Sequence, residues 1–254
     1  MSDIKKNLVF IPAVIISGNE SRSNSYQYGI KSWKFWCEKN NCELFVLDQL
    51  LLPNEEMRIT WQRYYIFQLL ENNGIKFDQI LMVDADSIIH PECPNFFEMT
   101  ERKFTGVHHD GSYDWVLRSM ENYSKYLFNG KMFNFWEYYM GGFQIFNETH
   151  KIFFNNILKF YENNKNVIKE LQNFYVGTDQ PVINFLLREN GIDLKLLPWE
   201  FSMSDMVRKE VLADDMLFTK VGWVYQFNAI PNNTNNYLTD YWMKKTYEYF
   251  HGVI

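Results

Sequence analysis

Two aspartates, Asp84 and Asp86, directly follow the apolar run 79–83 and are the residues best placed to do chemistry. Carboxylates at the end of a buried strand are costly to desolvate unless they have a partner. Their i, i+2 spacing on a turning backbone lets both reach one hard cation, and carboxylate oxygens suit Mg²⁺ or Mn²⁺. Such a cation could stabilise a diphosphate leaving group. The alternative is that the aspartates cap a turn and bind water; their position after a buried strand favours the metal site.

The elements that must position this pair follow the order strand, helix, strand, helix, strand. We expect strands at 8–16, 44–47 and 79–83, a helix at 26–40 with Ser25 as its N-cap, and a helix at 61–72. This alternation is typical of a parallel α/β sheet, whose ligands bind beyond the carboxyl ends of the strands. Both the loop after the first strand and Asp84 lie at that edge.

The second half of the chain is less regular. Residues 105–131 favour loop and short strand, and 231–236 a loop. We expect further strands at 143–146 and 194–197, and helices at 151–163, 180–190 and 241–250. No internal repeat and no Gly/Ser-rich linker divides the chain, so its length of 254 residues predicts one domain.

Composition and charge exclude several classes of protein. A hydrophobic content of 46% argues against disorder, and a net charge of −6 gives no general attraction to nucleic acid. Three irregularly spaced cysteines form no disulfide framework and suggest a reducing compartment, so we expect a cytoplasmic location. No apolar run is long enough for a transmembrane helix, and we see no secretory signal region. Nucleotide-binding glycine loops, a GxSxG elbow, HExxH and CxxC are all absent.

A strand that ends in DxD inside an α/β half resembles the GT-A class of nucleotide-sugar glycosyltransferases. More specifically, the sequence resembles glycosyltransferase family 6, which includes the histo-blood-group A and B transferases and the α-1,3-galactosyltransferases. The segments that carry the resemblance span about three fifths of the chain and keep the family's order. They are ITWQ at 59–62, MVDAD at 82–86, GVHHDGSY at 106–113, YYMGGF at 138–143 and TDQPVIN at 178–184.

The resemblance assigns roles on the donor side. Asp84 and Asp86 match the family's metal and diphosphate ligands. Met140, Gly141 and Gly142 match the positions that shape the pocket for the C2 substituent of the donor sugar, where small residues leave room for a hexose. The alternative for these glycines is a strand bulge without function.

The resemblance also assigns contacts to both sugars. Asp179 matches an aspartate that contacts hydroxyls of the donor sugar. His109 matches a residue that contacts the acceptor, the alternative being a histidine in a surface loop. Pyranose rings also stack on aromatic faces, and the tryptophans that we consider for the acceptor are Trp115, Trp136, Trp199 and Trp223.

Gln180 departs from family 6, which has Glu there as candidate nucleophile. An amide cannot form an ordinary glycosyl-ester intermediate. The glycogenin-like transferases of family 8 carry Asp-Gln-Asp-x-x-Asn at the equivalent point, and this chain has the same Asp179-Gln180 pair with Pro181 in place of the second Asp. Gln180 therefore suits a front-face mechanism, in which its amide oxygen stabilises the oxocarbenium-like centre. The alternative is a poor or inactive enzyme.

Other parts of the donor site depart further. The C-terminal His-x-x-Gly-x-x-Lys-Pro-Trp of family 8 is missing, and Gln226, Asn228 or water could take the third metal position. Arg22 and Arg63 are candidate phosphate cations, although either could be a solvated surface arginine. We expect Ile16, Ser17 and Asn19 to cradle the nucleotide at the end of the first strand.

Taken together, the sequence predicts a single GT-A-like α/β domain over 1–254 with a mixed, mostly parallel sheet. Residues 1–86 would form the nucleotide-binding half and 87–254 the acceptor-binding half. The expected activity is retaining transfer of a galactose- or N-acetylgalactosamine-type hexose from a UDP-sugar to an oligosaccharide or glycoconjugate, dependent on Mn²⁺ or Mg²⁺. The alternatives are a non-catalytic or weakly active carbohydrate- or nucleotide-sugar-binding protein, and a nucleotidyltransferase on a related fold. The sequence leaves the oligomeric state open.

Overall fold

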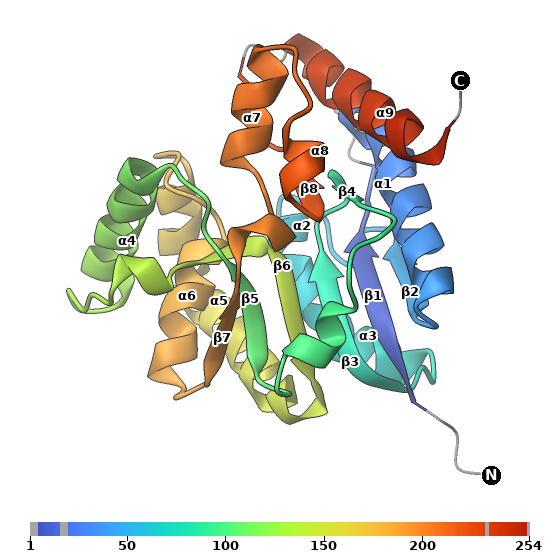
Figure 1. The fold of residues 1–254 in the computed structure, drawn as a ribbon. Coiled ribbons are helices and arrows are strands. Elements are labelled where there is room, and N and C mark those ends of the chain that lie inside the picture. Colours follow the sequence, from blue (N-terminus) through green and yellow to red (C-terminus); the bar gives the residue numbers. More distant parts are fainter. Residues whose placement is uncertain (1–4, 16–19, 232–233, 253–254) are drawn as a thin grey trace.

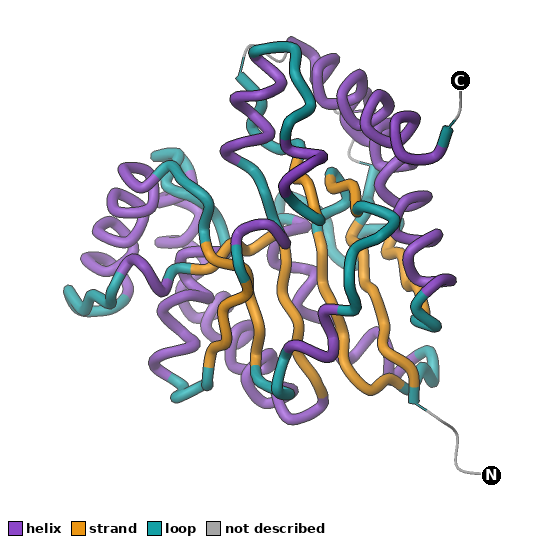
Figure 2. The backbone as a smooth tube through the Cα atoms, viewed as in Figure 1, coloured by secondary structure: helices purple, strands orange, loops and turns teal. Residues whose placement is uncertain are grey.

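The computed structural model describes residues 5–15, 20–231 and 234–252, and its centre is a six-stranded sheet (Figures 1 and 2). The strands of this sheet stand in the order β2-β1-β3-β6-β5-β7. Their bounds are β1 Lys6–Pro12, β2 Glu43–Leu47, β3 Phe77–Val83, β5 Phe104–His108, β6 Tyr139–Asn147 and β7 Leu194–Leu197. A short second sheet pairs β4 (Ser87–Ile89) with β8 (Val224–Gln226).

The direction of β6 distinguishes this sheet from a fully parallel one. β1 pairs parallel with β2 and β3, and β5 pairs parallel with β7, whereas β6 runs antiparallel to both of its neighbours, β3 and β5. The predicted mixed, mostly parallel α/β sheet is therefore confirmed. Strands from both halves of the chain belong to one sheet, because β6 pairs with β3.

Helices cover the two faces of the sheet and extend beyond its upper edge, where the last three pack with β4 and β8 in a separate core (Figure 1). They are α1 (Glu20–Lys39), α2 (Ile59–Gln62), α3 (Ile66–Asn72), α4 (Tyr113–Leu127), α5 (Lys151–Gln172), α6 (Gln180–Glu189), α7 (Asp205–Leu212), α8 (Phe218–Val221) and α9 (Tyr237–His251). Successive side chains along a strand point to opposite faces of the sheet, so each face has its own core. In β3, Ile80 and Met82 face the core that includes α3, α5 and α6. Leu81 and Val83 face the core that includes α1.

The segment 105–131 corrects the sequence prediction. It holds β5 followed by the 15-residue helix α4, where we expected loop and short strand. The buried side chains of α4 include Val116, Met120 and Tyr123, which recur at helical spacing. The polar residues between them hid this periodicity.

The N-terminal cap of the first helix is a second correction. α1 begins at Glu20, so Ser25 lies inside the helix, fully buried, and is not its N-cap. Ser and Asn favour loops and caps by local propensity, but packing of α1 on the sheet overrides that preference here. α5 likewise runs beyond the predicted end at 163 to Gln172, and α7 and α8 were not predicted.

Candidate active site

The candidate site lies where the carboxyl ends of the parallel strands meet, the upper edge of the sheet in Figure 1. Because β6 is antiparallel, its beginning, rather than its end, lies at this edge. Val83 pairs with Phe143, and the backbone N–H of Asp84 donates to the carbonyl of Gly142 at 3.1 Å. The structure therefore places the DAD and YYMGGF segments side by side.

Arg63 connects two aspartates at this edge of the sheet through hydrogen bonds. It lies in the 3₁₀ turn Arg63–Tyr65 between α2 and α3, and its side chain is buried. Its guanidinium donates to Oδ1 of Asp84 at 2.7 Å and to Oδ2 of Asp179. The hydroxyl of Tyr64 donates to the same Asp179 oxygen at 2.8 Å, and Thr178 donates to Oδ1 at 2.8 Å. The alternative that Arg63 is a solvated surface arginine is wrong.

One buried guanidinium in this cluster faces two carboxylates. Burial lowers the pKa of the Arg63 guanidinium, but Asp179 and Asp84 more than offset this and hold the pKa well above its ordinary value. Burial, followed by the charge of Asp179, raises the pKa of Tyr64 well above its ordinary value, so this phenol stays a neutral donor. Asp179 itself is 2% exposed, and both of its oxygens accept hydrogen bonds from protein groups. In this arrangement Asp179 orients neighbouring residues.

Two glycines beside this cluster let the side chains of Asp84 and Gln180 come close to the backbone of β6. A Cβ at Gly142 would stand 2.7 Å from Oδ2 of Asp84, and one at Gly141 would stand 3.0 Å from the Cβ of Gln180. The N–H of Gly141 donates to Oε1 of Gln180 at 2.8 Å, which fixes the orientation of this amide. Nε2 of Gln180 is buried without a hydrogen-bond partner of ordinary geometry among the described residues. The hydroxyl of Tyr138 lies near this amide: burial raises the pKa of Tyr138, and its interaction with Gln180 lowers that pKa by a smaller amount.

The side chains of Asp84 and Gln226 both lie near Gly142. Gln226 is fully buried, and its Nε2 would stand 3.2 Å from a Cβ on Gly142, close to Asp84. Its Oε1 has no hydrogen-bond partner among the described residues. The side-chain oxygen of Asn228 instead accepts from Arg208, so of the two amides considered for a third metal position Gln226 fits better. Carboxylates together with an amide oxygen make a hard donor set.

A metal held here would also need oxygens from outside this group. In the described part of the chain, no cluster of three or more His, Cys, Asp and Glu side chains is placed to hold a metal ion. Asp84 and Asp86 are close in sequence at the turn after β3, where Asp86 is 3% exposed and its carbonyl accepts from the N–H of Phe227. Phosphate oxygens or water would have to supply the remaining coordination positions of such a cation.

A cleft of about 660 Å³ opens next to Gln180. His109, Trp115, Met140 and Arg208 also line it. His109 is 5% exposed, stacks on Trp115 at 6.3 Å and accepts from the N–H of Gly111 through Nδ1 at 3.2 Å. Burial lowers the pKa of His109, which favours the neutral ring with its proton on Nε2. The alternative of a surface-loop histidine is wrong, and the cleft brings His109, Met140 and Gln180 together.

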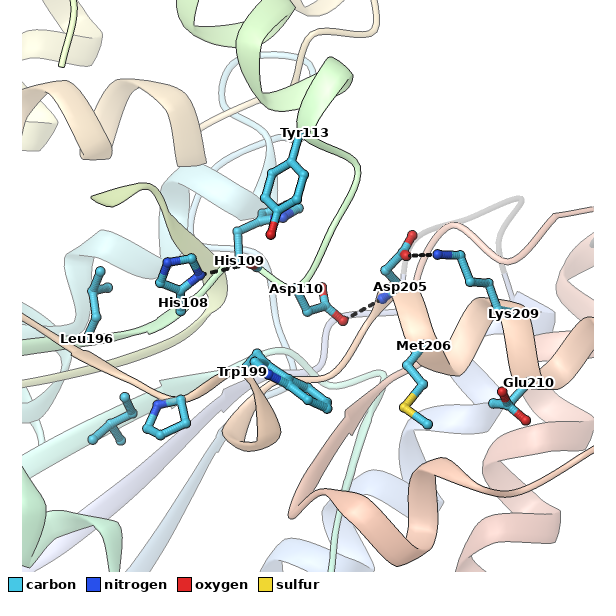
Figure 3. Close-up of a pocket in the computed structure, with 12 residues that line it drawn as sticks. His108, His109, Asp110, Tyr113, Leu196, Trp199, Asp205, Met206, Lys209 and Glu210 are labelled. Carbon is cyan, nitrogen blue, oxygen red and sulfur yellow. Dashed lines mark hydrogen bonds and ion pairs between the residues drawn. The ribbon is translucent and has the colours of Figure 1, made fainter. Parts of the chain in front are cut away.

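A second pocket of about 630 Å³ shares His109 with this cleft (Figure 3). Trp199 and Tyr113 contribute rings to its lining, and Trp199 is 36% exposed. Figure 3 shows Met206, Lys209 and Glu210 projecting from α7 on one side, with His108 and Leu196 on the other. Asp110 fixes α7 by accepting from the backbone N–H groups of Ser204 and Asp205. The two predicted acceptor residues thus line one continuous region.

Arg208 is the site residue that the sequence reasoning missed. It lines the cleft and donates through Nε to the carbonyl of Asn228 at 3.0 Å. Burial lowers its pKa, opposed by the carboxylates of Asp110, Asp205 and Asp86. Arg208 stands on a short helix, α7, which carries no recognisable motif. The sequence offered one indication of its role, which is a basic residue in the segment 205–212, where the apolar residues recur at helical spacing.

Several predicted residues are not brought to the site or lie outside the described residues. Trp223 packs against His90 and the core of α1, away from both pockets. Trp136 is 51% exposed, does not line either pocket, and makes an edge contact with Tyr113. Outside the described residues lie Ile16, Ser17 and Asn19, together with the side chain of Arg22. No helix in the described ranges has the length and apolar character needed to cross a membrane.

Comparison with solved structures finds glycosyltransferases. A glycosyltransferase involved in glycosylation of the major capsid of PBCV-1 matches with a TM-score of 0.63 at 9% identity, over 94% of this chain and 99% of that one. The apo structure of WbbM, a bifunctional glycosyltransferase, matches with a TM-score of 0.51 at 13% identity, over 96% of this chain and 45% of that one. No protein-family model and no curated protein matches the sequence. The chain therefore has the fold of solved glycosyltransferases, while the resemblance to families 6 and 8 stays a prediction.

Proposed function

We propose that this protein is a retaining glycosyltransferase that moves a hexose from a UDP-sugar to a glycan acceptor with the help of Mn²⁺ or Mg²⁺. The observation that carries the proposal is the convergence of Asp84, Gly142 and Gln180 at one sheet edge beside a cleft of about 660 Å³. The fold shared with solved glycosyltransferases supports it. A galactose- or N-acetylgalactosamine-type donor follows from the family 6 resemblance of Met140, Gly141 and Gly142.

On the donor side, Asp84, Asp86 and Gln226 would hold the cation. When bound, the cation would neutralise the diphosphate and stabilise it as a leaving group. Arg63 keeps Asp84 oriented, because the guanidinium is anchored on Asp179 by a second ion pair. Arg208 adds a fixed positive charge in the cleft wall, which favours a phosphate-bearing ligand in a protein of net charge −6.

On the sugar side, Gln180 acts through its amide. Its Oε1 accepts from Gly141 but has a second lone pair, so its dipole can still face the anomeric carbon. Its Nε2 makes no hydrogen bond of ordinary geometry among the described residues, so it can donate to a hydroxyl of the donor or the acceptor. This arrangement suits a front-face reaction, in which the acceptor hydroxyl attacks from the side of the departing diphosphate and the anomeric configuration is retained.

On the acceptor side, His109 and Trp199 border the approach to Gln180. Neutral His109 presents an N–H donor on Nε2, and Trp199 offers a partly exposed indole face for apolar contact with a pyranose ring. Trp115 stacks on His109 and keeps its ring in place. The acceptor would therefore enter over the loop that follows β5 and the turn that follows β7.

The test combines ligand binding with turnover. UDP with Mn²⁺ should raise the melting temperature, because a ligand at 100 times its Kd stabilises a protein by about 2.7 kcal/mol. The protein should then hydrolyse one UDP-sugar from a panel, and Asp86→Asn should abolish that hydrolysis. Stabilisation without hydrolysis of any donor would identify a binding protein. Release of pyrophosphate from a nucleoside triphosphate and a sugar phosphate would identify a nucleotidyltransferase.

A further inference from the structure

A third pocket, of about 530 Å³, shares Trp115 with the cleft in its lining. Its lining includes Arg58 before α2, Gln172 at the end of α5, and Tyr175 in the loop that leads to α6. None of these residues carries a role in the site described above. Because Trp115 lines both this pocket and the cleft, the two are adjacent and share its indole side chain.

The loop 175–178 that borders this pocket is held in place by α4. Four consecutive carbonyls accept hydrogen bonds from α4 side chains: that of residue 175 from Trp115 at 3.0 Å, that of 176 from Ser119 at 2.6 Å, and those of 177 and 178 from Tyr123 at 2.9 and 3.0 Å. Tyr175 has a left-handed backbone, φ 58°, and its side chain is 89% exposed. A non-glycine residue rarely adopts this conformation, and the anchored loop imposes it.

Two side chains that line this pocket, Gln172 and Arg58, have N–H groups that could donate hydrogen bonds to a ligand. Gln172 is 7% exposed, and its Nε2 has no hydrogen-bond partner among the described residues. Arg58 is exposed and forms no ion pair with any residue that the structure describes. A buried amide donor and an unpaired guanidinium in one pocket favour a ligand that brings oxyanion acceptors. The rings of Trp115 and Tyr175 favour a ligand that also has an apolar face.

We propose that this pocket is a remote acceptor subsite that binds a sugar unit carrying a carboxylate. The pyranose ring packs on Trp115 and Tyr175, and the carboxylate accepts from Arg58 and Gln172. The loop from 175 to 178 continues directly into Asp179 and Gln180, so a glycan seated here extends past Trp115 into the cleft. The proposal rests on the proposed glycosyl transfer for its acceptor, and it names the acceptor as an acidic glycan.

The test measures binding of D-glucuronic acid by NMR titration, with D-glucose as the neutral counterpart. Glucuronic acid should bind at least fivefold more tightly than glucose, and Arg58→Gln should remove that preference, since a charge-assisted hydrogen bond is worth about a tenfold change in affinity. Tyr175→Ala should weaken binding of both sugars. Arg118→Gln is the matched control, because Arg118 is exposed on α4 and does not line the pocket.

Donor hydrolysis, measured on the same variants, separates this proposal from the proposed function. Equal binding of the two sugars, or glucuronate binding that survives both Arg58→Gln and Tyr175→Ala, overturns the subsite even if hydrolysis is normal. Absence of hydrolysis in the unmodified protein overturns the proposed function instead, whereas glucuronate binding that depends on Arg58 would still support the pocket.

Discussion

Replacing Arg63 by Met should be among the most destabilising single changes in this chain. Met keeps much of the aliphatic length but removes the guanidinium that bridges Asp84 and Asp179. The side chain of Asp179 is 3% exposed and that of Arg63 5%, so the variant leaves a carboxylate in a space that water does not reach. The hydroxyl of Tyr64 remains as a donor to Asp179, but a neutral phenol does not balance a full charge.

The expected cost follows from this burial. Breaking a buried ion pair by removing one partner costs about 3–5 kcal/mol, because the other charge stays buried and uncompensated. An exposed pair such as Lys165–Glu162, whose side chains are 49% and 50% exposed, should contribute only about 0–1 kcal/mol. Asp179→Asn in the Arg63→Met background removes the stranded charge. The double variant should therefore recover part of the loss, with a coupling energy of about 1–3 kcal/mol.

The assay is urea unfolding followed by tryptophan fluorescence and by circular dichroism, since coincident transitions justify a two-state free energy. Lys165→Met serves as the surface control. The reasoning would be refuted if Arg63→Met lost less than about 1 kcal/mol, the range of an exposed pair. It would also be refuted if the losses of the two single variants simply added in the double variant, because additivity would mean that Arg63 and Asp179 do not interact.

Three further predictions concern the site and its pH dependence. Gly142→Ala should lower donor hydrolysis more than about tenfold, because the added Cβ would stand 2.7 Å from Oδ2 of Asp84; a normal rate with an unchanged circular-dichroism spectrum would contradict the packing argument. Gln180→Ala should slow transfer but leave UDP affinity nearly intact, and an unchanged rate would remove Gln180 from the mechanism. Burial lowers the pKa values of His109 and His150 from 6.5, so the unfolded chain takes up protons that the folded chain refuses. The free energy of unfolding should therefore fall as pH drops below about 6.5, and equal urea midpoints at about pH 7.5 and 5.5 would argue against this.

The first half of the fold could be predicted because its signals are local. The strands β1, β2 and β3 are continuous apolar runs, and the intervening helices carry their own periodicity and stop signals. Since parallel strands end at one edge, the position of Asp84 followed from its place after β3 alone. The resemblance of the YYMGGF and TDQPVIN segments to known transferases then indicated which other residues belong with it.

The rest of the site depends on contacts between distant segments, which no local pattern encodes. Arg63 lies 21 positions from Asp84 and 116 from Asp179, and only the folded chain shows that one guanidinium serves both. Arg208 joins the cleft because Asp110 caps the helix that carries it. The polar residues of α4 likewise concealed a helix whose side chains hold the loop before Asp179.

The reversed strand β6 explains why the parts of this site are far apart in sequence yet fixed in space. In a fully parallel sheet, the beginning of a strand lies at the edge opposite to the ligand site. Because β6 runs antiparallel, the segment 139–142 begins at the same edge at which β3 ends, and the bond from the Asp84 N–H to the Gly142 carbonyl sets their register. A slip of one residue would turn every side chain of β6 to the other face, and in one of the two directions it would bring Phe143 beside Asp84 in place of Gly142. The pairing of β3 with β6, and not nearness in the sequence, therefore brings Asp84 and Gly142 together.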